Sequence, residues 1–341
     1  MVHSRSWHSR LFGVACLVTA GTLALAGCSS SDEEGPNDSG SGDSASADSD
    51  SDTTADASWP RTFENADGTT TEIPEQPQQI ASTSVTVTGT LLAFDAPVAA
   101  SGSAANGEYF AQWADEAADV ENLWPAGSVD IEALYAAEPD LIVVAATGND
   151  SVADQVDELN EIAPTIVVDY GGQTWQELAE QLGEATGLED EAAATVEEFD
   201  SYVADAAAKI DVPDGEANIV SYNGPGEDNP IARATSAQAL LLTDLGFTVE
   251  DPPVEWHTQP QPRDDFVFAP YENLTELTAD TSFILSQDNA GAEDGFAADE
   301  VLANLPSVQA EQIYGLGVNS FRVDMFSATE IVDDVVENFA K

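Results

Sequence analysis

The sequence predicts an α/β protein of two Rossmann-like lobes, each with a mostly parallel sheet, joined by one long α-helix. Two observations support this fold class. Short apolar runs rich in β-branched residues alternate with amphipathic segments, as in βαβ units whose strands are buried on both faces. A single long amphipathic segment, 189–210, interrupts the alternation, which then starts again. We therefore expect an N-terminal lobe at 59–188, a linking helix at 189–210 and a C-terminal lobe at 211–341.

The elements of the two lobes follow from hydrophobic periodicity. The segment 140–145, Asp-Leu-Ile-Val-Val-Ala, is typical of a strand buried on both faces. In the first lobe we expect strands at 80–82, 98–100, 140–145 and 165–170, and helices at 87–94, 131–137, 152–162 and 175–185. In the second we expect strands at 218–222, 282–286 and 312–316, and helices at 237–245, 272–277 and 325–339, with a proline-rich stretch at 252–262.

The linking helix shows one apolar stripe. Val196, Phe199, Val203, Ala206 and Ile210 recur at steps of three or four residues, which places them on one face of a helix. The segment Asp-Val-Pro-Asp-Gly that follows ends the helix.

The first 58 residues predict an export signal and a tether. Two arginines precede a short apolar run that ends in Leu-Ala-Gly-Cys, which resembles the bacterial lipobox. We expect a signal peptide at 1–27, a lipidated Cys28 and a disordered acidic tether at 28–58, rich in Ser, Asp and Gly. This predicts a protein anchored to the outer face of the cell membrane. The alternative is an ordinary transmembrane anchor, for which the apolar run is short.

The charge balance excludes several kinds of partner. The chain has 341 residues, with 64 acidic and eight basic side chains and a net charge of −56. Nine acidic residues lie in the tether and two basic ones in the signal, so 59–341 keeps 55 and six, a net charge of −49. Six cations cannot form a nucleic-acid or polybasic membrane surface. Such acidity is also found in proteins adapted to high salt, and equally in secreted proteins by compositional drift.

Several kinds of catalytic or metal site are missing from 59–341. This part of the chain has no cysteine and a single histidine, His257, so zinc-thiolate and His-rich metal sites are excluded. Neither lysine follows a glycine-rich phosphate loop, and there is no Gly-x-Ser-x-Gly motif. We therefore expect no enzyme activity, no directly bound metal and no cofactor of the protein's own.

The lipobox, the tether and the two lobes together resemble the cluster A-II (class III) substrate-binding lipoproteins of ABC importers. Specific strings are similar to those of the ferric-enterobactin-binding members. They are Ser-Thr-Ser-Val-Thr-Val-Thr-Gly-Thr-Leu-Leu-Ala from 82, Gln-Trp from 112, Pro-Asp-Leu-Ile from 139, Ile-Ala-Pro-Thr from 162, Ser-Ala-Gln from 236, Leu-Gly-Phe from 245, Tyr-Gly-Leu-Gly from 314 and Phe-Arg-Val-Asp from 321. The likeness spans roughly 59–339.

This resemblance implies a monomeric receptor that carries an iron(III)–siderophore between two lobes to a membrane permease and its ATPase. The iron belongs to the cargo. The resemblance also implies that Glu132 and Glu272 present one carboxylate per lobe to the permease. The alternative is that both are solvated carboxylates at helix starts, favoured by the helix dipole.

The few cations indicate where an anionic cargo binds. Iron(III) held by three catecholates carries a charge of −3, so an acidic protein has to concentrate cations in the cleft. Arg233, Arg263 and Arg322 lie in loops of the second lobe, and the resemblance matches Arg263 and Arg322 to arginines of the enterobactin receptors. The arginine fork donates to phenolate oxygens and stacks on aromatic rings. The alternative is that the three arginines pair with neighbouring carboxylates.

One departure from the family concerns the cargo. The enterobactin receptors carry a longer, arginine-containing segment where this chain has only 103–110, so the resemblance does not extend to an arginine contact from the N-terminal lobe. Tyr109, Trp256 and Tyr222 are candidates for aromatic walls of the cleft. The leading hypothesis is a catecholate cargo, and a hydroxamate siderophore, haem or a corrinoid remain alternatives. A lipid-anchored surface enzyme or a structural lipoprotein would be of another class.

Overall fold

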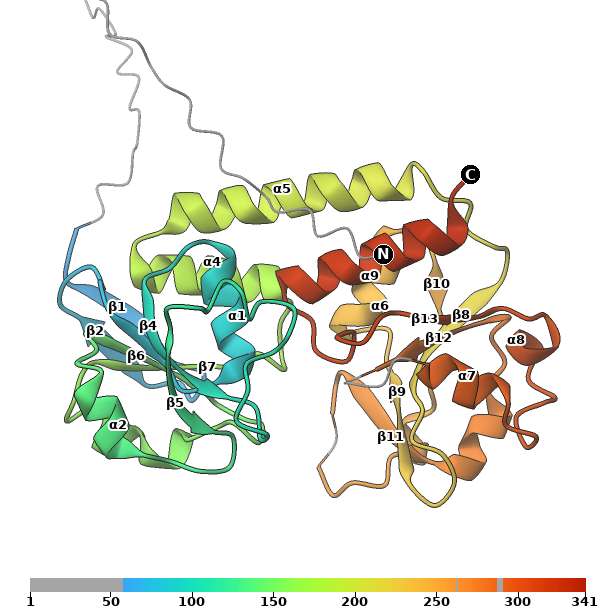
Figure 1. Ribbon diagram of the computed structural model, residues 1–341, viewed down its shortest axis with the longest axis horizontal. Helices are drawn as coiled ribbons and strands as arrows, with labels where there is room; N and C mark the ends of the chain where they lie inside the picture. Colours follow the sequence, from blue (N-terminus) through green and yellow to red (C-terminus); the bar gives the residue numbers. More distant parts are fainter. Residues whose placement is uncertain (1–57, 262, 287–290) are drawn as a thin grey trace, which may run out of the picture. The chain divides into compact units, whose positions relative to one another are not determined.

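The computed structural model describes residues 58–261, 263–286 and 291–341. The predicted signal at 1–27, Cys28 and the tether up to 57 lie outside the described residues. We use "N-terminal lobe" for 59–188 and "C-terminal lobe" for 211–341. Figure 1 shows a separate sheet in each of them. Among the described residues, no helix is long and apolar enough to cross a membrane.

The N-terminal lobe contains a five-stranded, fully parallel sheet with the order β5-β4-β3-β6-β7. Its strands are β3 (Ile80–Ser82), β4 (Val98–Ser103), β5 (Glu121–Pro125), β6 (Leu141–Ala145) and β7 (Thr165–Val168). Its helices are α1 (Val85–Ala93), α2 (Ile131–Ala136), η1 (Ala153–Gln155), α3 (Val156–Leu159) and α4 (Trp175–Thr186). A hairpin of β1 (Arg61–Glu64) and β2 (Thr70–Ile73) precedes the sheet.

The central strand β6 shows why a continuous apolar run forms this sheet. All five of its residues are buried. Leu141, Val143 and Ala145 face one hydrophobic cluster, whereas Ile142 and Val144 face another on the opposite side. Each buried aliphatic side chain of this size contributes about 1.5–3 kcal/mol. A strand with apolar partners on both faces needs no polar alternation, as the sequence predicts.

The C-terminal lobe contains a mixed sheet with the order β11-β9-β8-β12-β13, with β10 beside β8. Its strands are β8 (Glu216–Ser221), β9 (Asp228–Ala232), β10 (Thr248–Val249), β11 (Phe266–Pro270), β12 (Thr281–Leu285) and β13 (Ile313–Gly315). Its helical elements are α6 (Ala237–Asp244), η2 (Val254–Trp256), η3 (Tyr271–Glu276), α7 (Ala292–Ala297), α8 (Pro306–Gln309) and α9 (Met325–Phe339).

The α/β class is confirmed, and the second sheet is less parallel than expected. β9 pairs antiparallel with both β8 and β11, and we did not predict β9 or β11. The sequence of β9, Asp-Asn-Pro-Ile-Ala, reads as a turn because its proline lacks a ladder donor. The helix predicted at 152–162 is shorter and is divided into η1 and α3, and the one predicted at 272–277 is the 3-10 helix η3, shifted by one residue.

The predicted linking helix is α5 (Glu189–Ala207), which ends before the expected boundary at residue 210, because Ile210 instead forms a β-bridge with Ala340. Its buried stripe includes Phe199, Val203 and Ala206, as the periodicity predicts. α9 packs against α5 and also against α1 of the N-terminal lobe (Figure 1). One hydrophobic cluster therefore continues from the N-terminal sheet, through these helices, to the C-terminal sheet. Two helices, and not α5 alone, join the lobes.

A crowded carboxylate on α9 gives a first prediction. Burial, followed by repulsion from Glu330, Glu337, Asp333 and Glu293, raises the pKa of Asp334 from 3.8 to about 6. The folded state therefore favours the protonated form, and this contribution to stability is present below pH 3.8 and lost as the pH rises through about 6.

We expect Asp334→Asn to raise the free energy of unfolding at pH 8 by on the order of 1 kcal/mol, because the side chain is half-exposed and its repulsion is screened. The gain should shrink between pH 6 and 4, and urea unfolding at several pH values measures it. Asp205→Asn, which removes an exposed charge from α5, is the control. An equal gain from both variants would show that only net charge matters.

Candidate functional site

A hollow of about 320 Å³ is lined by residues of both lobes. The N-terminal lobe contributes the turn segment 104–106 and 108–112, and the C-terminal lobe contributes Ser286 and residues around 318–322. The second segment follows β13 and leads directly into α9. Of the six residues predicted to contact ligand, Tyr109 and Arg322 line this hollow.

Arg322 reaches across to the N-terminal lobe. Its Nη1 donates to Thr86 Oγ1 at 3.2 Å, and its guanidinium carbon lies 5.8 Å from the centroid of the Phe110 ring. Its Nε is buried and has no hydrogen-bond partner among the described residues. No ion pair within the described part of the chain involves Arg322. The cation is therefore held by a hydroxyl and an aromatic ring, and not by a carboxylate.

The other two arginines are engaged by carboxylates. Arg263 makes a bidentate ion pair with Asp265, with distances of 2.7 Å from Nε to Oδ1 and 2.5 Å from Nη2 to Oδ2. Arg233 lies 3.6 Å from Asp251 and 3.7 Å from Asp264, measured from guanidinium nitrogen to carboxylate oxygen. The alternative noted from the sequence, pairing with nearby acids, thus describes these two arginines.

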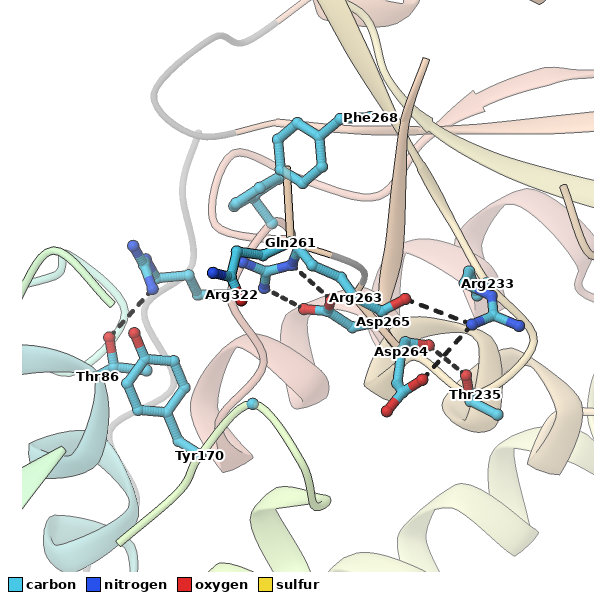
Figure 2. Close-up of polar contacts among 12 residues, drawn as sticks. Thr86, Tyr170, Arg233, Thr235, Gln261, Arg263, Asp264, Asp265, Phe268 and Arg322 are labelled. Atoms are coloured by element: carbon cyan, nitrogen blue, oxygen red, sulfur yellow. Dashed lines mark hydrogen bonds and ion pairs between the residues drawn. The ribbon is translucent and has the colours of Figure 1, made fainter. Parts of the chain in front are cut away.

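The three arginines nevertheless lie in one region (Figure 2). Arg233 Nη1 donates to the carbonyl oxygen of Arg263 at 3.4 Å. The hydrogen bond to Asp265 raises the pKa of Arg263, and Tyr170 adds to this effect. Burial raises the pKa of Tyr170, and the charge of Arg322 acts on it in the opposite direction. Tyr170, at the carboxyl end of β7, is therefore near both Arg263 and Arg322.

On the N-terminal-lobe side of the region that holds the three arginines, a buried carboxylate organises the hydrogen bonds. Asp150 accepts hydrogen bonds from Ser84 Oγ at 2.6 Å and from Tyr170 Oη at 3.1 Å. Gly148 has φ +102°, and a Cβ there would lie 2.0 Å from Tyr170 Oη. Only glycine fits this position, because a side chain would displace the phenol.

The aromatic candidates occupy different places. Tyr109 packs against Trp113 in a tilted arrangement with 5.4 Å between ring centroids, and burial raises the pKa of Tyr109 to about 12. Tyr222 donates to Asp299 Oδ2 at 2.5 Å, and Tyr271 donates to the same oxygen at 2.6 Å. Tyr222 and Trp256 pack against a hydrophobic cluster of the C-terminal lobe that includes Val220 and Phe296, and they do not line the hollow. Their contact with ligand stays a prediction.

The two candidate docking glutamates are both exposed. Glu132 lies in the first turn of α2, and Glu272 lies in the first turn of η3. Such positions are favourable for a carboxylate because they lie at the positive end of the helix dipole. Their docking role stays a prediction.

Three residues of the hollow and its rim were missed by the sequence reasoning: Thr86, Phe110 and Gln112. Phe110 and Gln112 line the hollow, and Thr86 bonds Arg322. Gln112 lies in a string that the sequence already singled out. Thr86 and Gln112 are neutral and carry no charge signal, and Phe110 is one of thirteen phenylalanines, so nothing in the sequence separated these three from their neighbours.

Comparison with known proteins now identifies the family. The model of the periplasmic binding protein family matches residues 80–319. The chain belongs to this family. It is 37% identical over 289 residues to the ferric enterobactin-binding periplasmic protein FepB of Escherichia coli, covering 81% of this chain and 90% of FepB. It is 25% identical to the probable siderophore-binding lipoprotein YfiY of Bacillus subtilis, covering 82% and 88% of the two chains.

Solved structures agree with this assignment. The crystal structure of holo-ViuP matches with a TM-score of 0.80 at 50% identity, covering 83% of this chain and 96% of ViuP. Membership of the periplasmic binding protein family confirms the predicted class of importer-associated binding proteins. It also confirms that the chain is a binding component of transport and not an enzyme.

Proposed function

We propose that this periplasmic binding protein captures an iron(III)–siderophore of the catecholate type in the hollow between its lobes and delivers it to the permease and ATPase of an ABC importer. The observation that carries the proposal is Arg322, a cation that lines the hollow with no carboxylate partner among the described residues. The similarity to FepB, named for ferric enterobactin, supports the same class of cargo.

Electrostatics explains why such an arginine matters here. A trianionic iron complex is repelled by a body with a net charge of −49. At ~6 Å and an effective dielectric constant of ~20, one arginine attracts the complex by several kcal/mol before desolvation is counted. An arginine that is already neutralised by a carboxylate attracts the complex much more weakly. Arg322 is therefore the primary contact in this proposal.

Arg263 is the second contact, because it can exchange Asp265 for phenolate oxygens of the cargo. It is 44% exposed in its side chain, so the carboxylate is replaceable. The proposal of a cargo contact is weakest for Arg233, since its guanidinium already contacts the Arg263 carbonyl and two carboxylates. Tyr109 and Phe110 supply aromatic surface next to Arg322. Tyr222 and Trp256 are proposed as outer walls for the larger parts of the cargo.

The remaining parts of the chain have proposed roles from the sequence. We propose that 1–27 is removed on export and that lipid on Cys28 anchors the protein through the tether 28–58. The protein is then monomeric at the outer face of the cell membrane. Glu132 and Glu272 are proposed to contact the permease.

The identity of the cargo is tested by intrinsic-fluorescence titration of residues 59–341. Aromatic side chains line or flank the hollow, so an iron complex bound there should quench their emission. We expect saturable quenching by a ferric catecholate and none by a ferric hydroxamate, haem or cobalamin. Saturation by one of the other three would reassign the cargo and keep the transport role.

The arginine assignment predicts unequal losses of affinity for the ferric catecholate. Arg322→Ala should weaken binding about 30-fold and Arg263→Ala about tenfold, because a hydrogen bond to a charged group contributes about 1.5–3 kcal/mol. Arg61→Ala is the control, since Arg61 pairs with Glu189 away from the hollow. Unchanged affinity in both cleft variants would refute the assignment.

The docking assignment predicts a defect in transport without a defect in binding. Glu132→Ala with Glu272→Ala should leave the affinity for cargo unchanged and abolish stimulation of the permease-associated ATPase in vesicles. Glu158→Ala with Glu300→Ala removes two other exposed glutamates and is the matched control. Normal stimulation of the ATPase by the Glu132→Ala, Glu272→Ala variant would mean that the permease recognises other residues.

A further inference from the structure

The start of α9 is tied to the N-terminal lobe by a buried carboxylate. Asp324, the N-cap of α9, is only 4% exposed. Its Oδ1 accepts from the backbone N–H of Ser327 at 2.9 Å, which is the usual capping bond. Its Oδ2 accepts from Nε2 of Gln112 at 3.1 Å. Gln112 is 212 residues away and belongs to the other lobe.

A second donor of the N-terminal lobe points to the same place. Trp113 is fully buried, and its Nε1 has no hydrogen-bond partner among the described residues. A Cβ on Gly89 of α1 would lie 2.7 Å from Asp324 Oδ2 and 2.8 Å from Trp113 Nε1, so both atoms flank the same point above α1. Gly89 thus lets the carboxylate and the indole approach the helix.

Asp324 is connected through the backbone to Arg322. The hydroxyl of Ser327 accepts from the N–H of Asp324 at 3.0 Å and donates to the carbonyl oxygen of Arg322 at 2.7 Å. Gln238 Nε2 donates to the carbonyl oxygen of Phe321 at 2.8 Å. The peptide units on both sides of Arg322 are therefore fixed, one by the cap of α9 and the other by α6.

We propose that Asp324 is a positioning residue: its cross-lobe bond to Gln112 sets the backbone of Arg322 so that the guanidinium enters the hollow. This inference rests on the proposed function and deepens it. Asp324 is buried and does not line the hollow, so it acts through its neighbours, Arg322 on its own lobe and Gln112 on the other. The bond joins the N-terminal-lobe wall of the hollow to the segment that carries its principal cation.

Capping alone does not explain this arrangement. A helix cap uses one carboxylate oxygen and is normally formed at the surface, where water serves the other oxygen. Here desolvation raises the pKa of Asp324, although several hydrogen bonds oppose the rise. Burial of a carboxylate is unfavourable unless its oxygens are paired. The donor that pairs Oδ2 comes from the opposite lobe, where a change in lobe separation would remove it.

An isosteric exchange of donor and acceptor tests the bond in the ligand-free protein. Gln112→Glu places two carboxylates together, and amide hydrogen exchange over 320–327 should accelerate about tenfold. Asp324→Asn alone should accelerate exchange over 320–327 less, because Gln112 can turn its amide and accept a hydrogen bond from the new N–H₂ group. The double variant re-forms the bond in reverse and should restore exchange to within about twofold. Gln78→Glu is the matched control, since the side-chain amide of Gln78 donates only to backbone carbonyls of its own lobe.

A double-mutant cycle then tests whether the effect passes through Arg322. Gln112→Ala should weaken binding of a ferric catecholate about tenfold in the wild-type background and less than about twofold in the Arg322→Ala background. Equal losses in both backgrounds, or no acceleration of exchange by Gln112→Glu, would overturn the positioning role. If the wild type bound no ferric catecholate, the proposed function would fail, while the exchange experiment would still decide whether the bond fixes 320–327.

Discussion

The continuous apolar layer formed by α1, α5 and α9 is the constraint on which the rest of the molecule depends. It joins one face of the parallel N-terminal sheet to one face of the mixed C-terminal sheet in a single hydrophobic cluster. A lone linking helix could bend at its ends, but α9 also packs on α1 of the opposite lobe. Separating the lobes would expose this shared surface to water, so the loops that face the hollow are held in a narrow range of positions.

With the lobes held together in this way, the distribution of charge determines which ligands the hollow can bind. Carboxylates dominate 59–341, and all four of its arginines already contact an acid, a neutral hydroxyl or an aromatic ring. Arg322 differs from Arg233 and Arg263 because its partners carry no charge. Membership of the periplasmic binding protein family gives this local difference a functional meaning, since a receptor for an anion needs a cation that its own surface has not neutralised.

Much of the fold could be predicted from the sequence because burial on both faces leaves a direct trace in it. The apolar run of β6 and the stripe that includes Phe199 and Val203 are such traces. β9 was not predicted, because Pro230 and its polar neighbours resemble a turn, although pairing with β8 and β11 makes the segment a strand. Arg322 could be singled out by the scarcity of cations. Gln112 could not be assigned a role, because its partner Asp324 is brought near only by tertiary packing.

The different partners of the two cleft arginines have a kinetic consequence. An incoming anion meets only neutral partners at Arg322, the hydroxyls of Thr86 and Tyr170, but it has to compete with a bidentate carboxylate at Arg263. If both arginines hold the cargo as proposed, partner exchange at Arg322 has the lower barrier, and capture would proceed from Arg322 to Arg263. Release would run in the opposite order, with Asp265 pairing again with Arg263 first. A carboxylate that weakens equilibrium binding would then also help the cargo to leave.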